Sequence, residues 1–461
     1  MRRMSRTSAY FTSLGSVGEV GASAHLIEID GLSLLLDSGL HPKKEGRASL
    51  PDFGQLRRPP DAVLISHGHH DHCASLPYFL KMFPSATPYA TDATVAILDR
   101  MLSNSVSVME KMRLERGIED YPLYSRDDVA ATVRRLGRGI PMGREFTVRP
   151  GKDVTVTFSP AGHVLGAACT LITSPNHTVL YTGDICVIEQ ELLPGIKLPP
   201  EAREVDTLII ESTYGANDVA HEIEYKTEVG RFAEAITRVI NREGVVLIPS
   251  FALGRTQEVL NMISRLQHRG KIPDVPVYAS GLGRAIYEIY QRFHHELKRN
   301  VVMTPIENFG SVGDVWDPRI VRQLTAEPCI IVATSGMMVE NTPSAMIAER
   351  LVLDKKHGIF FVGYCDPETL GYKVRTAKEG DRLVFRLGGS AQPIICDDRQ
   401  WFYFSAHAHR EDLCKVIDQV KSKNLVFVHG DPPAVDWMMQ NAGPGRKKFA
   451  PKIGEPIALK A

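Results

Sequence analysis

The densest group of side chains that could do chemistry is the run Ser66-His67-Gly68-His69-His70-Asp71-His72. An apolar, β-branched stretch precedes it and an apolar helical pattern follows, so the run lies where a buried strand passes into a helix. His67 and His69 are two residues apart and point the same way in extended chain, and Asp71 and His72 follow as the chain turns. Two imidazoles aimed at one point, with an Asp–His pair beside them, suit two metal ions. Imidazoles and carboxylates without thiolates fit two Zn2+ ions, with Mn2+ or Fe2+ as alternatives.

The remaining ligands must come from distant parts of the chain, and the ends of other apolar runs supply candidates. Such runs lead to His163, Asp184 and His429, and Asp184 could serve two ions because a carboxylate has two oxygens. Further apolar runs lead to Asp37, Glu211 and His407. Functional groups on loops after strands are the usual way in which an α/β scaffold builds one site. The recurrence of this placement is therefore more informative than any single residue.

Short apolar runs alternate with longer helical patterns along most of the chain, which predicts an α/β protein. The predicted strands are His25–Ile29, Ser33–Leu36, Ala62–Ser66, Val154–Phe158, Val179–Tyr181, Thr207–Ile210, Val245–Ile248, Val277–Ala279, Cys329–Ala333, Ile359–Val362, Trp401–Phe404 and Leu425–Val428. The predicted helices are Cys73–Met82, Thr94–Glu115, Glu222–Arg242, Arg255–Arg269, Gly283–Arg292, Ala345–Leu353 and Arg410–Lys421. The segment Met303–Pro318 is rich in Gly, Pro, Asn and Asp and predicts a loop.

Three motifs resemble those of the metallo-β-lactamase fold: the run from His67 to His72, Gly162-His163-Val-Leu-Gly-Ala167 and Thr182-Gly-Asp184. The stretch Leu35-Leu-Asp37-Ser-Gly39 resembles the first motif of that fold, whose Asp usually supports a metal ligand from the second coordination shell. The resemblance therefore implies a metallo-hydrolase site in the first part of the chain.

Further motifs resemble the β-CASP branch of this fold, a group of nucleases related to the endonuclease subunit of the messenger-RNA cleavage and polyadenylation complex. They are Glu211-Ser-Thr-Tyr-Gly215, Pro249-Ser-Phe-Ala-Leu-Gly-Arg255, Ala333-Thr-Ser-Gly-Met337, Phe404-Ser-Ala-His407 and Val428-His-Gly430. The resemblance runs from about residue 12 to about residue 435, in matching order and spacing. It implies an αββα sandwich formed by residues 1–206 and 398–461, with an α/β β-CASP domain inserted at 207–397.

The resemblance also implies roles for the site residues. Asp184 would bridge two metal ions, one held by His67, His69 and His163 and the other by Asp71, His72 and His429. The catalytic residues would be Asp71, Glu211 and His407. A histidine at the position of His429 accompanies RNA-cleaving members, whereas DNA-cleaving relatives tend to carry an apolar residue there.

The metal-ligand candidates predict a metal-dependent hydrolase, and the resemblance implies that it is a ribonuclease acting in RNA processing or decay. Two cations can lower the pKa of a bridging water, orient the resulting hydroxide and neutralise the phosphoryl oxygens. The leaving alkoxide then needs a proton, for which His407 is the candidate acid, with Glu211 raising its pKa and holding its ring. Whether cleavage is endonucleolytic or 5′-exonucleolytic stays open. The alternatives are a DNA nuclease of the same fold, a non-catalytic partner subunit and a lactamase-fold hydrolase of a small thioester or lactam.

Weaker signals point to substrate contacts. Ser335 and Gly336 follow an apolar run in a loop whose backbone N–H groups could face a phosphate, although a plain turn fits equally well. Arg255 could meet the RNA backbone or an acidic neighbour, and Lys373 could contact a phosphate or simply be solvated. Departures from the family pattern at His409, Asp431, Pro367 and Tyr372 bear on substrate choice rather than on the metal ligands.

Composition narrows the class of protein. The 461 residues contain 54 Lys plus Arg and 54 Asp plus Glu, with 43% hydrophobic residues, which excludes a disordered tail, a coiled-coil rod and a histone-like polycation. Neither a stretch of 18 apolar residues nor an apolar leader segment is present, so no membrane contact is expected. Seven scattered cysteines without a Cys-x-x-Cys pair predict reduced thiols in a cytoplasm. The expected partner is single-stranded RNA, and a homodimer is an open alternative.

Overall fold

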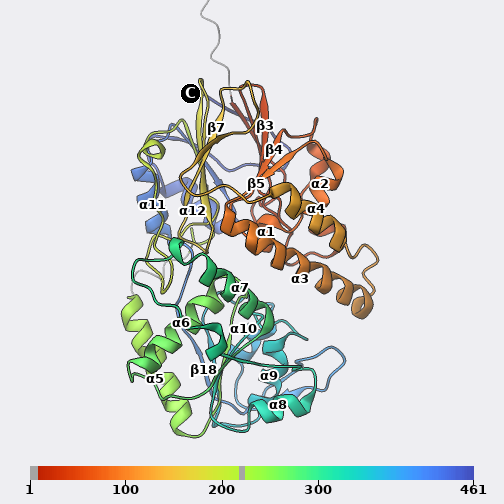
Figure 1. Ribbon diagram of the computed structural model, residues 1–461, viewed down its shortest axis with the longest axis vertical. Helices are drawn as coiled ribbons and strands as arrows, with labels where there is room; N and C mark the ends of the chain where they lie inside the picture. The colour runs from red at the N-terminus through yellow and green to blue at the C-terminus, as the bar shows by residue number, and fades with distance from the viewer. Residues whose placement is uncertain (1–8, 217–223, 461) are drawn as a thin grey trace, which may run out of the picture. The chain divides into compact units, whose positions relative to one another are not determined.

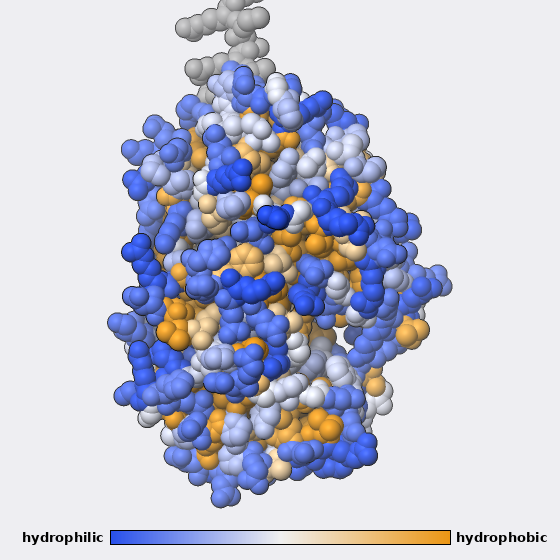
Figure 2. All heavy atoms as spheres, viewed as in Figure 1, coloured by the Kyte–Doolittle hydropathy of each residue, from blue (hydrophilic) through white to orange (hydrophobic). Residues whose placement is uncertain are grey.

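The computed structural model describes residues 9–216 and 224–460. Contacts divide this described chain into two compact units (Figure 1). The first unit comprises residues 9–189, 193–216 and 407–460, and the second comprises 190–192 and 224–406. Polar side chains cover most of the visible surface, with smaller apolar patches between them (Figure 2). Among the described residues, no helix has the length and apolar character needed to cross a membrane.

The described part of the first unit contains two sheets. One has six strands in the order β21-β1-β2-β3-β4-β5, and the other has seven in the order β20-β19-β10-β9-β8-β7-β6. The strands of the first sheet are β1 (Ala9–Ser13), β2 (His25–Ile29), β3 (Leu32–Leu36), β4 (Ala62–Leu64), β5 (Thr87–Tyr89) and β21 (Ile457–Leu459). Those of the second are β6 (Glu145–Thr147), β7 (Thr155–Pro160), β8 (Ala168–Thr173), β9 (Thr178–Tyr181), β10 (Thr207–Glu211), β19 (Asn424–Val428) and β20 (Lys447–Phe449).

The two sheets pack face to face through one apolar cluster, which includes Phe11 and Leu34 from the first sheet and Ile172 and Val426 from the second. Helices cover the outer faces: α2, α3 and α4 lie on one side and α11 and α12 on the other (Figure 1). Their bounds, with α1 and the short 3-10 turns, are α1 (His70–Cys73), α2 (Leu76–Met82), α3 (Asp92–Arg116), α4 (Arg126–Leu136), α11 (Arg410–Gln419), α12 (Pro432–Asn441), Gly46–Ser49, Phe53–Gln55 and Pro200–Arg203. This layering is the predicted αββα sandwich.

The second unit is built on a parallel sheet in the order β13-β12-β14-β11-β15-β18. Helices α5, α6 and α7 pack on one face and α8, α9 and α10 on the other, so the central strands β11, β14 and β15 are buried on both sides. The bounds of these strands and of a two-stranded ribbon are β11 (Val246–Pro249), β12 (Val277–Ala279), β13 (Gly310–Ser311), β14 (Ile330–Ala333), β15 (Gly358–Phe361), β18 (Asp398–Trp401), β16 (Arg382–Leu383) and β17 (Gln392–Pro393). The helices are α5 (Tyr225–Asn241), α6 (Arg255–His268), α7 (Gly281–Arg292), α8 (Pro318–Leu324), α9 (Pro343–Leu351) and α10 (Leu370–Thr376), with 3-10 turns at His294–Glu296 and Ile306–Asn308.

The predicted α/β class is confirmed, but three of the predicted segments are wrong in detail. The segment Met303–Pro318, predicted as a loop, contains the 3-10 turn Ile306–Asn308 and the short strand β13. The predicted strand Trp401–Phe404 is wrong. The strand in the structure is β18, which pairs with β15 at the edge of the sheet through mostly polar residues and ends at Trp401. The predicted helix Cys73–Met82 is two helices, α1 and α2, separated by Ala74 and Ser75. The first residues of the predicted helix Glu222–Arg242 lie outside the described residues.

The predicted domain boundaries at 206/207 and 397/398 remain predictions, but contacts group two strands differently from them. Strand β10 pairs with β9 and β19 and so belongs to the first unit. Strand β18 pairs with β15 and so belongs to the second.

Candidate metal centre and active site

Three of the candidate residues stand at the carboxyl ends of neighbouring parallel strands. In the second sheet β10 lies between β9 and β19 and runs parallel to both. Asp184 follows β9, Glu211 is the last residue of β10, and His429 directly follows β19. Because parallel strands end at the same edge of a sheet, these side chains come together although they lie far apart in the sequence.

The histidine run is held by backbone bonds from the segment before β2 and from the segment after β3. Ser38 N donates to His72 O at 2.8 Å and Leu40 N donates to His70 O at 2.9 Å, while Ser23 N donates to Asp71 O at 2.8 Å. These bonds occupy the carbonyls of α1, which ends after one turn and fixes Asp71 and His72 beside the strand ends. The approach is close at Gly39, where a Cβ atom would lie 1.8 Å from Asp71 O.

A first donor group is formed by His67, His69, His163 and Asp184, whose donor atoms all lie within 4.8 Å of one another. His69 Nδ1 lies 3.1 Å from His67 Nε2 and 3.0 Å from His163 Nε2. Asp184 Oδ2 lies 3.7 Å from both of these Nε2 atoms. The rings of His67, His69 and His163 stand nearly edge to face around this point.

A second donor group, formed by Asp71, His72 and His429, lies on the other side of Asp184. His429 Nε2 lies 3.3 Å from both His72 Nε2 and Asp71 Oδ2. Asp184 Oδ1 approaches this group, at 3.4 Å from His72 Nε2 and 3.3 Å from His429 Nδ1. Each oxygen of Asp184 therefore serves one group, and all seven predicted ligands lie in the two groups. Their binding of metal remains a prediction.

The donor atoms fit tetrahedral zinc. With Zn–N bonds of about 2.0–2.1 Å, tetrahedral ligand atoms stand about 3.3–3.4 Å apart, and the separations in both groups scatter around that figure. Among the described residues, no hydrogen bond of normal geometry reaches the buried Asp184 Oδ1, although two imidazole nitrogens are close to it. Several donor atoms that converge on one point are what a cation requires. Nitrogen and carboxylate oxygen donors without a thiolate are also chemically suited to zinc.

Asp37 contacts one histidine of the second donor group directly and one of the first group through Ser66. Its Oδ2 accepts from His72 Nδ1 at 2.7 Å and from Ser66 Oγ at 2.8 Å, and its Oδ1 accepts from Ser66 N at 2.7 Å. Ser66 Oγ also lies 3.0 Å from His67 Nδ1. Bonds at Nδ1 leave Nε2 of His72 and His67 facing the donor groups, which is the usual second-shell arrangement at metal-binding histidines.

The electrostatics of the cluster follow from burial and the dense carboxylates. Burial lowers the pKa of His72, but Asp184, Asp37 and Asp71 more than offset this and raise its pKa well above the usual value. Burial raises the pKa of Asp184, but His429 and His72 more than offset this and hold its pKa well below the usual range. His67 differs, because burial and the neighbouring His72 hold its pKa well below the usual value. Asp184 is thus ionised and His67 is neutral, the forms in which each can bind a cation.

His407 and Glu211 form a pair beside the first donor group. His407 Nδ1 lies 3.2 Å from Glu211 Oε2, and the rings of His407 and His163 are 4.5 Å apart. Glu211 is buried, and its Oε1 accepts from Ile185 N at 2.6 Å. Burial lowers the pKa of His407, but the charge and hydrogen bond of Glu211 outweigh it and raise the pKa to about 9. His407 therefore carries a proton at neutral pH.

Sequence reasoning missed several residues that hold this site. Tyr214 places its ring edge against His407 and stacks on His409, with ring centroids 5.6 and 5.7 Å apart. Thr213 Oγ1 lies 3.2 Å from His429 Nδ1. Ser66 and Tyr181 also act here, since Tyr181 Oη donates to Asp37 Oδ2 at 2.6 Å. The sequence around Tyr181 gave no signal of this contact, because a phenol in a buried strand also fits as core packing.

The four candidate substrate contacts all lie in the second unit. Arg255 is buried and donates to Gln190 Oε1 at 2.8 Å, an arrangement that favours packing within the unit. Ser335 Oγ accepts from Val339 N at 3.1 Å, so its hydroxyl serves the turn after β14. A Cβ atom at Gly336 would lie 2.8 Å from Phe251 N. Lys373 is exposed on α10. Their contact with substrate remains a prediction.

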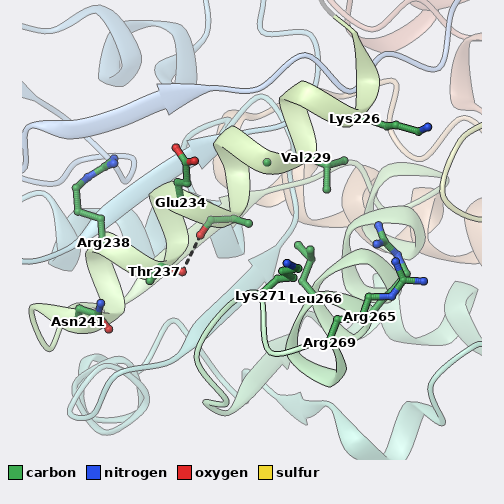
Figure 3. A pocket seen from close by; sticks show the side chains of 12 residues that line it. Lys226, Val229, Glu234, Thr237, Arg238, Asn241, Arg265, Leu266, Arg269 and Lys271 are labelled. Carbon is green, nitrogen blue, oxygen red and sulfur yellow. Dashed lines mark hydrogen bonds between the residues drawn. The ribbon is translucent and has the colours of Figure 1, made fainter.

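The second unit also has a basic groove between α5 and α6, with a volume of about 700 Å3 (Figure 3). Two of its cations are engaged: Arg238 with Asp398 at 3.0 Å and Arg265 with Glu191 at 2.6 Å. None of the metal-binding clusters found among the described residues includes a residue of this groove. The candidate chemistry thus lies in the first unit.

Comparisons with protein families match the chain in three places. Residues 17–203 match the metallo-beta-lactamase superfamily, 256–374 the Beta-Casp domain, and 392–443 the Zn-dependent metallo-hydrolase RNA specificity domain. The chain is a metallo-β-lactamase and β-CASP protein. The predicted fold, a metallo-β-lactamase domain with an inserted β-CASP domain, is thereby confirmed. This β-CASP metallo-hydrolase carries an RNA-specificity domain and a His/Asp cluster that could bind metals.

Related proteins have been described in fungi, an amoeba and an insect. The chain is 31% identical to Endoribonuclease ysh-1 of Neurospora crassa over 91% of this chain and 52% of that protein. It is 31% identical to Cleavage and polyadenylation specificity factor subunit 3 of Dictyostelium discoideum (93% and 54%) and 30% identical to Cleavage and polyadenylation specificity factor 73 of Drosophila melanogaster (91% and 59%). The chain thus spans about half the length of the curated relatives it matches.

The fold is shared with solved structures. One example is a protein of unknown function from Enterococcus faecalis V583, with a TM-score of 0.57, 14% sequence identity, and coverage of 98% of this chain and 100% of that one.

Proposed function

We propose that this protein is a zinc-dependent endoribonuclease that hydrolyses phosphodiester bonds within single-stranded RNA. The observation that carries the proposal is the pair of donor groups that share Asp184, with the protonated His407 beside them. A phosphodiester is anionic and needs both charge neutralisation and a proton for its leaving oxygen. The cluster offers both functions within a few ångströms.

One ion would be held by His67, His69, His163 and Asp184, and the other by Asp71, His72, His429 and Asp184. When bound, two such cations activate water and neutralise charge on the phosphoryl oxygens. Asp37 keeps His72 in the tautomer that presents Nε2 to the cluster.

His407 would protonate the leaving oxygen. Its Nδ1 proton is engaged by Glu211 Oε2, so the proton that is transferred would come from Nε2. Glu211 holds the ring in place and keeps the imidazolium form dominant at neutral pH. Because Glu211 is buried and bonded to Ile185 N, its position is fixed before substrate arrives.

The choice of RNA and of internal cleavage has separate support. The match to an RNA specificity domain, together with His429 at the position typical of RNA-cleaving members, favours RNA over DNA. The name of the Neurospora crassa relative, an endoribonuclease, supports internal cleavage. Unpaired RNA is the expected form because its backbone can bend into a site at the edge of a sheet.

The test is the linearisation of a circular single-stranded RNA, which no exonuclease can attack. Zinc-loaded protein should open the circle and should leave a DNA circle of the same sequence intact. A chelator-stripped sample and the variant His67→Ala serve as controls and should be inactive. An intact RNA circle alongside degradation of 5′-labelled linear RNA would replace internal cleavage with 5′-exonucleolysis. Cleavage of DNA alone would overturn the choice of RNA.

Two further points belong to the proposal. The seven cysteines all lie among the described residues, form no disulfide and are mostly buried, which suits a reducing cytoplasm. Homodimer formation stays a prediction.

A further inference from the structure

We propose that Tyr181 is a positioning residue for the metal ligand His72 and that it acts through the carboxylate of Asp37. The inference rests on the metal site of the proposed function. It concerns the affinity of the site for its cation and does not depend on the identity of the substrate.

The first step is the contact between Asp37 and His72. Asp37 Oδ2 lies 2.7 Å from His72 Nδ1, and both side chains are buried. With Nδ1 engaged in this bond, Nε2 is the nitrogen of His72 that faces the cluster, 3.3 Å from Nε2 of His429. The place of Asp37 Oδ2 therefore decides where His72 Nε2 points.

The second step is what holds Asp37 Oδ2. Tyr181 Oη donates to it at 2.6 Å, shorter than the bonds from Ser66 Oγ at 2.8 Å and from His72 at 2.7 Å. Hydrogen bonds from uncharged donors to a buried carboxylate are strong because the acceptor is ionised. Burial raises the pKa of Tyr181 well above its usual value, so the phenol keeps the proton that it donates.

The third step is the origin of the two residues in the fold. Asp37 follows β3 of the first sheet, whereas Tyr181 ends β9 of the second, so their hydrogen bond joins the two sheets behind the cluster. Tyr181 also lies three residues before Asp184 on the same segment. The phenol thus ties the position of His72, through Asp37, to the segment that carries the bridging carboxylate. The substitution Tyr181→Phe removes this hydrogen bond and leaves the aromatic ring in place.

The experiment is a zinc titration of the full chain in a buffered series of free-zinc concentrations, without RNA. Tyr181→Phe should weaken binding of the zinc that His72 would hold by about tenfold, at the lower end of the effect of residues that hydrogen-bond to metal ligands. Tyr124→Phe is the matched control, because Tyr124 is equally buried in the same unit and packs in the cluster beneath α3 and α4. It should bind zinc like the wild type.

A double-mutant cycle with Asp37→Asn tests whether the effect passes through Asp37. In that background Tyr181→Phe should change zinc affinity by less than about twofold, since the acceptor charge is already gone. Three results would each overturn the proposal: unchanged zinc affinity in Tyr181→Phe, an equal loss in Tyr124→Phe, or a full tenfold loss that persists in the Asp37→Asn background. If Asp37→Asn cannot be purified, the comparison of the two Tyr→Phe variants decides alone. Because no RNA is present, an inactive but zinc-binding protein would refute only the nuclease proposal.

Discussion

Replacing Glu211 with Gln should change the pH dependence of cleavage through His407. Glu211 Oε2 lies 3.2 Å from His407 Nδ1, and its charge is the largest of the influences that raise the His407 pKa to about 9 against the lowering by burial. The substituted glutamine would keep the volume and a polar contact while it removes the charge. The His407 pKa should then fall from about 9 to 6.5 or below.

The magnitude follows from the protonated fraction. At pH 7.5 a group with a pKa of about 9 is about 97% protonated, whereas one with a pKa of 6.5 is about 9% protonated. If the imidazolium is the general acid, Glu211→Gln should cut the rate about tenfold at pH 7.5. The loss should shrink to less than about twofold at pH 6 and grow to about 100-fold at pH 9. The alkaline limb of the profile should therefore move to lower pH.

The assay is single-turnover cleavage of a labelled RNA from pH 6 to pH 9, with zinc content measured in each sample. The control is Glu19→Gln, which removes a carboxylate paired with His41 at 3.1 Å in the same unit but outside the cluster. It should follow the wild-type profile. A ratio of wild-type to Glu211→Gln rates that is constant across this range would refute the coupling between Glu211 and the His407 proton.

Three other variants test separate parts of the account. His407→Ala should lose about 10²–10⁴ in rate with its zinc retained, and a substrate with a sulfur leaving atom should restore cleavage; failure of that rescue together with lost zinc would make His407 a ligand. Asp184→Ala should lose both zinc ions and all cleavage, because each of its oxygens faces one donor group; normal zinc content would end its bridging role. In the second unit, burial raises the pKa of Glu258 to about 7 from 4.5, so the folded state binds the extra proton and stability falls as pH rises from 4.5 to 7. Glu258→Gln should lack about 3 kcal/mol of this loss in the free energy of unfolding. In urea unfolding the variant should therefore be more stable than the wild type at pH 8 and equally stable at pH 4.5. If the free energy of unfolding depended on pH in the same way for both proteins, this prediction would be wrong.

The grouping of the seven candidate ligands could be predicted from the sequence because the signal is local in each segment. A run with four histidines is unlike a solvated turn, and the single residues His163, Asp184 and His429 each follow a strand that reads clearly as an apolar run. The parallel order β9-β10-β19 then brings the distant pieces to one edge. A polar residue directly after an apolar strand was thus enough to identify each candidate ligand. The parallel alignment of the strands then brings these residues together.

The supporting hydroxyls could not be predicted, since nothing local distinguishes them. Tyr181 and Ser66 lie in or beside apolar strands, where a phenol or a hydroxyl also fits as ordinary core packing. Their role appears only when β3 and β9, from different sheets, are placed face to face. A contact between sheets has no signature in either strand alone.

The errors in the elements have a related cause. Phe402 and Phe404 form an apolar alternation that predicts a strand, but in the structure they bury their rings in the core with α5 after the strand has ended. The strand itself, Asp398–Trp401, is polar because an edge strand needs only backbone pairing on one side. The hydrophobic pattern therefore predicted correctly that Phe402 and Phe404 are buried, but it placed the hydrogen-bonded strand too late in the sequence.

The central claim, a dinuclear centre built on Asp184, is tested most directly by anomalous diffraction at the zinc edge from crystals of the zinc-loaded chain. The account predicts two peaks about 3.5–4 Å apart, the spacing of two-metal sites. One should adjoin His67, His69 and His163, the other should adjoin Asp71, His72 and His429, and Asp184 should lie between them. A single peak, no peak, or peaks away from this cluster would contradict the account.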